Sequence, residues 1–132
     1  MVNKVYIIPC SGVGKVYGSI CREATYIVVD ELAKDRTVTE CLPLIVKGKE
    51  EVIDKIKDNK IITLDGCGAK CAFVDVSQVI RTPDASFLST MIIKDNRDLK
   101  PEPEIYPLGE KAKLLTQIFA EQIVEKVDEL LE

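Results

Sequence analysis

The chain has 132 residues, of which 46% are hydrophobic and 30% charged, and its formal net charge is −4. This length predicts a single domain, residues 1–132, with a core of its own. The slightly acidic charge offers no electrostatic basis for binding nucleic acid. No apolar run approaches the length of a membrane span, and the N-terminus lacks a signal-peptide cleavage pattern. We therefore expect a soluble cytoplasmic protein without nucleic-acid or membrane partners.

The cysteines, and the lack of histidine, limit the chemistry that the chain can perform. There are five cysteines and no histidine. An odd number of cysteines in a cytoplasmic chain argues against a disulfide framework and for metal or thiol chemistry. Without imidazole, Cys-His and Ser-His-Asp catalysis are excluded, and any metal must be held by thiolates, carboxylates, backbone groups or water.

Strands and helices are expected to alternate along the first half of the chain. Residues 4–9 form a nearly continuous, β-branched apolar run, which is typical of a central parallel strand. Residues 42–46 fit either the end of a strand or the start of a helix. The other expected elements are a turn at 10–14, an amphipathic helix over about 16–34, a short strand at 37–40 and a helix at 50–59.

The second half continues this alternation. Residues 60–64 predict a third strand and residues 86–94 a fourth. Residues 95–107 are polar and contain three prolines, so we expect an extended connector there. The remaining expected elements are a turn at 65–70, a helix over about 69–79 and a long amphipathic helix over 109–131.

This order of elements predicts an α/β fold. We expect a three-layer sandwich with a mostly parallel, Rossmann- or flavodoxin-like sheet of about four strands, followed by a long C-terminal helix. The apolar stripe of that helix is longer than a small sheet requires. We expect it to dock on its own sheet, although it would also permit a homodimer.

Four of the cysteines are expected to meet at one edge of the sheet. Cys10, Cys41 and Cys67 each stand at the carboxyl end of a predicted strand, and Cys71 begins the helix after the third strand. In a parallel sheet these ends share one edge, where neighbouring strands lie ~5 Å apart. Zinc–sulfur bonds of ~2.3 Å can bridge that spacing. By topology alone, the four thiols should therefore converge.

The turn that carries Cys67 is rich in glycine. Gly66 and Gly68 flank Cys67, which we attribute to a need for positive φ or for a close backbone approach to a metal. Asp65 has two compatible interpretations. It accepts hydrogen bonds from N–H groups of the turn beside the site, or it is an Asp-Gly turn residue with local hydrogen bonds.

Two lysines, Lys15 and Lys70, flank the proposed cluster of cysteines. Either lysine would offset the negative charge of metal-bound thiolates, although plain surface positions fit both of them. Cys21 differs from the other four cysteines, because it falls on the apolar face of the first helix. A free cysteine in that setting is usually a small core residue.

Three other interpretations of the first turn are weaker. The stretch from Gly12 to Lys15 is only part of a phosphate-binding loop, because Pro9 replaces the first glycine and Val16 the magnesium-binding hydroxyl. Cys10 also resembles the phosphocysteine of sugar-transporting phosphotransferase B components, with backbone donors from residues 11–14. That analogy leaves the other strand-end cysteines unexplained. The loop of low-molecular-weight tyrosine phosphatases needs an arginine where this chain has Val16.

The cysteine motifs resemble those of a known family. Asp65-Gly66-Cys67 followed by Cys71, with Cys10 after the first strand and Cys41 between, resembles the DGC-domain family of zinc-binding proteins, over roughly residues 5–93. The resemblance implies Cys10, Cys41, Cys67 and Cys71 as zinc ligands and leaves Cys21 outside the set. The segment 13–17 departs from the small, polar continuation of the family. The family has no established reaction, so the resemblance supports a metal rather than an activity.

Three functions remain open on the sequence. The first is a zinc-binding protein, whose site would be closed and structural if all four cysteines bind. The second is a thiol-based enzyme or a sulfur or persulfide carrier, in which Cys67 or Cys10 is the nucleophile. The third is an iron–sulfur protein, because four thiolates also suit such a cluster. The sequence predicts neither a substrate nor a physiological partner.

Overall fold

A computed structural model describes residues 4–10, 12 and 14–132. Within this part of the chain, one four-stranded, all-parallel sheet has the order β2-β1-β3-β4. This is the beginning of the flavodoxin-like strand order, 2-1-3-4-5. The predicted α/β fold is therefore confirmed. The strands are β1 (Val5–Pro9), β2 (Thr37–Thr39), β3 (Lys60–Asp65) and β4 (Ala85–Leu88).

The central strand β1 is buried on both faces of the sheet. Val5 and Ile7 pack into one apolar cluster, whereas Tyr6 and Ile8 pack into the other. Alternate residues of a strand point to opposite faces, so a nearly continuous apolar run is what a doubly covered strand requires. β1 pairs with β3 in a register that places Pro9 beside Leu64. The loops that follow these two strands therefore leave the sheet side by side.

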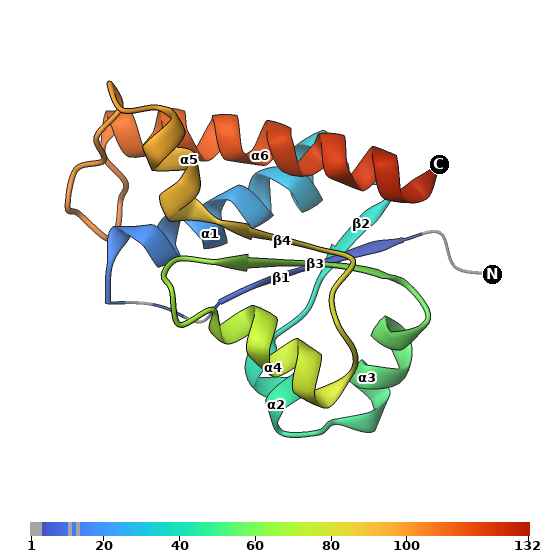
Figure 1. Ribbon diagram of the computed structural model, residues 1–132. Helices are drawn as coiled ribbons and strands as arrows, with labels where there is room; N and C mark the ends of the chain where they lie inside the picture. The colour runs from blue at the N-terminus through green and yellow to red at the C-terminus, as the bar shows by residue number, and fades with distance from the viewer. Residues whose placement is uncertain (1–3, 11, 13) are drawn as a thin grey trace.

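Helices cover both faces of the sheet and make it the middle of three layers (Figure 1). One layer contains α1 (Val16–Ile27), the short π-helix η1 (Val28–Leu32), α5 (Ser89–Asp95) and α6 (Glu110–Leu131). The other contains α2 (Leu42–Val46), α3 (Glu50–Lys57) and α4 (Cys71–Val79). The long α6 buries its apolar stripe with α1 and the sheet, as we expected.

The prediction of a strand at residues 86–94 is wrong for the second half of that range. The strand β4 ends at Leu88, and residues 89–95 form the helix α5. Ser89 and Ile92 are buried while Met91 is 47% exposed, which is a helical spacing rather than the alternation of a strand. A short apolar run does not distinguish a strand from a buried helix by its periodicity.

Other boundaries differ less. The helix expected over residues 16–34 ends as the π-helix η1, in which the N–H of Ala33 donates to the carbonyl oxygen of Val28 at 2.8 Å. The ambiguous residues 42–46 form the helix α2. Residues 96–109 contain neither helix nor strand, as expected for the connector. Among the described residues, no helix has the length and apolarity that crossing a membrane requires.

Phe119 provides a test of the layer formed by α1, α5 and α6. Its side chain is fully buried, and its ring meets that of Phe87 edge to face with centroids 5.8 Å apart. We expect Phe119→Ala to lower the free energy of unfolding by about 3–5 kcal/mol, because the truncation leaves a cavity. Leu114, 55% exposed on the same helix, is the control. Leu114→Ala should change stability by less than about 0.5 kcal/mol in urea unfolding. Similar losses in both variants would contradict this packing.

Candidate functional site

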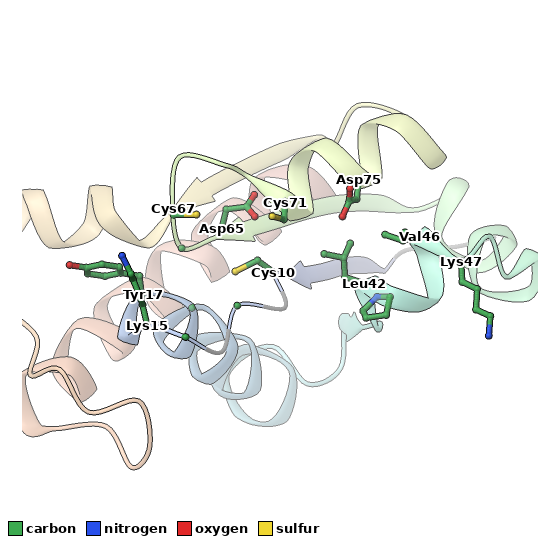
Figure 2. A pocket seen from close by; sticks show the side chains of 15 residues that line it. Cys10, Lys15, Tyr17, Leu42, Val46, Lys47, Asp65, Cys67, Cys71 and Asp75 are labelled. Carbon is green, nitrogen blue, oxygen red and sulfur yellow. The ribbon is translucent and has the colours of Figure 1, made fainter.

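The candidate site lies where the chain changes direction across the sheet. β1 continues into α1 on one face, whereas its neighbour β3 continues into α4 on the other. In open α/β sheets, such a topological switch point is where ligands bind, outside the carboxyl ends of the strands. A cavity of about 690 Å³ occupies this position (Figure 2).

Three cysteines from two neighbouring strand ends line this cavity. Cys10 follows β1, Cys67 lies in the turn after β3, and Cys71 is the first residue of α4. Cys67 and Cys71 are exposed, whereas Cys10 is half-buried. In Figure 2 the sulfur atoms of Cys67 and Cys71 point toward each other, and Cys10 lies below them in the view. The expected meeting of strand-end thiols therefore holds for these three.

Cys41 lies nearby but outside this cavity. It is exposed and stands immediately before α2. It lines a neighbouring cavity of about 350 Å³, to which Cys10 also contributes. The structure thus brings Cys41 to the same edge of the sheet, on the other side of Cys10 from Cys67 and Cys71.

The donor atoms suit zinc, although the side chains do not enclose an ion. Three thiols on one cavity are the ligands that zinc prefers. Among residues 4–10, 12 and 14–132, however, no group of three or more cysteine, aspartate, glutamate or histidine side chains is placed to hold a metal ion. Binding would therefore require the exposed side chains of Cys67 and Cys71 to move toward Cys10.

Asp65 holds the start of α4 in place. Its side chain is buried, and its two carboxylate oxygens accept hydrogen bonds from the N–H groups of Ala72 at 2.8 Å and Phe73 at 3.1 Å. These are among the N–H groups that a helix leaves unpaired at its first turn. Burial raises the pKa of the Asp65 carboxyl despite both hydrogen bonds. Asp65 therefore positions Cys71, and its oxygens are engaged by the backbone.

Gly66 allows the β3–α4 turn to touch α1. A Cβ atom on Gly66 would lie 2.8 Å from the nitrogen of Gly18 and 2.9 Å from the carbonyl carbon of Tyr17. A Cβ on Gly18 would in turn overlap the carbonyl oxygen of Gly12. The expected close approach is thus real at Gly66, but its partner is the backbone of α1. Gly68 has open space around it, and neither Gly66 nor Gly68 has a positive φ, so that part of the expectation was wrong.

The surroundings of Cys10 favour its thiolate form. The pKa of Cys10 is lowered to about 6, and the largest cause is a hydrogen bond from the Cys21 thiol. Backbone hydrogen bonds from Gly12 and Gly66 lower the pKa further, whereas burial and the charge of Asp65 raise it. Hydrogen bonds to the charged form of an acid favour that form. At neutral pH, Cys10 is therefore largely ionised.

Cys21 has a second role that its position in the sequence did not indicate. It is fully buried on the core-facing side of α1, as predicted. The hydrogen bond that it gives to Cys10, together with burial, raises the pKa of the Cys21 thiol, so it remains a protonated donor. Helical periodicity predicted the buried face but not this contact, because the contact depends on how Cys10, at the end of β1, packs against α1.

The remaining predicted site residues differ in their roles. Desolvation and the negative charge of Asp65 raise the pKa of Cys71, so the start of α4 does not favour its thiolate, contrary to what its helical position suggests. Lys15 lines the cavity. Lys70 adopts the left-handed conformation with φ of 49° before α4, and its Nζ lies 5.8 Å from the ring centroid of Phe73.

One wall of the cavity was not foreseen. Leu42, Pro43 and Val46 line it from α2, whose residues left the choice between strand and helix open. A strand would have pointed alternate residues to opposite faces, whereas a helix places positions three and four apart on one face. Lys47 and Asp75 border the same end (Figure 2).

The comparisons with known proteins yield one match. A family model described as DGC domain matches residues 6–117, which extends from β1 into the first turns of α6. No curated protein and no solved structure matches the chain.

The contact at Gly66 yields a prediction with a matched control. We expect Gly66→Ala to lower the free energy of unfolding by about 1–3 kcal/mol, because the added Cβ would press on the backbone of Gly18 and Tyr17. Gly68→Ala should be neutral or stabilise by up to about 1 kcal/mol, since its surroundings are open. Urea unfolding of both variants measures the difference. Equal effects would mean that the turn does not rest on α1.

Proposed function

Because the chain belongs to the DGC-domain family, we propose that it binds zinc through thiolates at the junction of β1 and β3. The observation that carries the proposal is that Cys10, Cys67 and Cys71 line one cavity. They come from positions far apart in the sequence, and the low pKa of Cys10 supplies one thiolate at neutral pH. Ionised thiols are the form that binds metal.

The proposed ligands are Cys10, Cys67 and Cys71. Zinc held by three protein ligands keeps an open position, where it acts as a Lewis acid or activates bound water. Cys41 would close the site as a fourth ligand and make it structural, as the four-cysteine prediction has it. Its place in the neighbouring cavity favours the three-thiolate site.

Other residues of the chain would support such a site without binding the metal. Asp65 fixes the first turn of α4 and so the position of Cys71. Gly66 and Gly18 keep the two cysteine-bearing loops in contact. Lys15 places a positive charge on the cavity, which offsets part of the charge of three thiolates around a divalent ion.

Metal content of single variants tests the ligand set. We expect protein purified anaerobically to contain about one zinc ion per chain, and Cys→Ser at Cys10, Cys67 or Cys71 to lower this well below one, because a serine hydroxyl is a poor zinc ligand. Melting temperature should fall with the metal, since binding is coupled to folding. Elemental analysis and thermal unfolding measure both effects.

Two further variants make this experiment decisive. Cys21→Ser is the control, and it should keep the metal. Cys41→Ser separates the two ligand sets, because retention supports three thiolates and loss supports the closed four-cysteine site. If the protein absorbs visible light and contains iron, the cofactor is an iron–sulfur cluster rather than zinc. A colourless wild-type protein without bound metal would refute metal binding altogether.

A second candidate function is thiol chemistry at Cys10. Its half-buried sulfur has a pKa of about 6 and opens onto a cavity of about 690 Å³. Reactive cysteines are accessible thiolates in such surroundings. Cys67 and Cys71 line the same cavity and would be the thiols that resolve an adduct on Cys10. An enzyme or a sulfur carrier would both use this arrangement.

The pH dependence of alkylation tests this second function. In chelator-treated protein, we expect the labelling rate of Cys10 by iodoacetamide to rise with a midpoint of about pH 6 and to level off above it, because the thiolate reacts. Trypsin cleaves after Lys15, Arg22 and Lys70, so each cysteine falls in its own peptide for mass spectrometry.

The matched variant for this experiment is Cys21→Ala. It removes the largest cause of the low pKa, so the midpoint for Cys10 should move up toward the ordinary value of 9.0. A midpoint near that value in the wild-type protein, or no shift in Cys21→Ala, would contradict the activation of Cys10 by Cys21.

A further inference from the structure

We propose that the cavity at the carboxyl ends of β1 and β3 binds a small organic anion with a short apolar chain, such as an aliphatic carboxylate. The inference deepens the proposed zinc site and rests on it in one respect, since bound zinc would offset the charge of the thiolates that the anion approaches. The inference is supported by the volume of the cavity and by its lining, which is apolar at one end and positively charged at the other.

The cavity has the size of a small-molecule site. Its volume of about 690 Å³ lies within the range of roughly 300–1,000 Å³ that is usual for such ligands. This is far more space than a metal ion and a water molecule need. A closed structural metal site would have no use for it.

The wall of the cavity is apolar at one end. Pro43 and Val46 project from α2 beside the buried Leu42, and Val46 is 54% exposed. Apolar side chains that stay uncovered at a concave surface favour an apolar group of a ligand. Asp75 lies at this end, and the side chain of Lys47 points away in Figure 2. The apolar end is therefore unsuited to an anionic group.

The other end carries a positive charge. Lys15 and Tyr17 border it, near Cys67 (Figure 2). The ion pairs among the described residues involve other lysines and arginines, so Lys15 is available to a ligand. The carboxylate of Asp65, the nearby acid, already accepts two backbone hydrogen bonds. An anionic head group beside Lys15 and an apolar chain along α2 match this division.

The experiment is an NMR titration with octanoate, using ¹⁵N-labelled protein in zinc-loaded and chelator-treated forms. We expect octanoate to shift the amide signals of Gly14, Tyr17 and Val46, and to bind the zinc-loaded form more tightly. Octanol, which has the same chain without the charge, should bind several-fold more weakly. Butanoate, which has the charge with a shorter chain, should also bind more weakly, because it reaches less of α2.

Two pairs of variants test the contacts of the ligand's carboxylate and of its alkyl chain separately. Lys15→Met should raise the Kd for octanoate about threefold, as expected for one exposed ion pair, whereas Lys34→Met, at an exposed site elsewhere, should not. Val46→Asp should raise the Kd about tenfold through lost apolar contact. Val74→Asp, 40% exposed on α4, is its control.

The outcomes distinguish this inference from the proposed function. Zinc bound at one per chain without octanoate binding would overturn the anion site and leave zinc binding intact. Octanoate binding that depends on Lys15 and Val46 in a chain that takes up no zinc would support the anion site and refute the metal. Equal affinity for octanol and octanoate, or equal effects of a variant and its control, would overturn the inference.

Discussion

Direct backbone contact between three segments is the constraint on which the candidate site depends. The turn after β3 rests with Gly66 on the first turn of α1, and Gly18 of that turn rests on Gly12 in the loop after β1. A single methyl group in either contact would separate the segments. Because two of them carry Cys10 and Cys67, the distance between the thiols is determined by packing of main chain rather than of side chains. The glycines thus act on the chemistry without touching a ligand.

The buried polar groups around the cavity each satisfy a specific need. Asp65 accepts hydrogen bonds with both carboxylate oxygens from N–H groups at the start of α4, and the protonated Cys21 thiol donates a hydrogen bond to the sulfur of Cys10. A buried polar group without a partner is costly, so such groups are normally paired. Here the pairing leaves a half-buried thiolate at Cys10 and two exposed thiols, Cys67 and Cys71. The first metal ligand would thus be ionised and held in place, whereas the other two side chains would be free to reorient.

Sequence patterns predicted the sheet and three of the cavity cysteines for the same reason. Strand ends of a parallel sheet share an edge, so Cys10, Cys67 and Cys71 follow from topology once the strands are identified. Other features depend on three-dimensional contacts that no local pattern encodes. Ser89 is the first residue of α5, inside an apolar run, and its buried hydroxyl donates to the carbonyl oxygen of Tyr17 at 2.9 Å. The cavity wall formed by α2 and the contact of Cys21 with Cys10 also depend on such three-dimensional contacts.

The hydrogen bond from Ser89 to Tyr17 spans 72 positions of the sequence. It joins the first turn of α1, against which Gly66 rests, to a helix that follows the last strand. A ribosome delivers the chain from its N-terminus, so Cys10 emerges long before the groups that complete its surroundings. During synthesis, the Cys10 thiol therefore stays open to oxidation until β4 and α5 have been made.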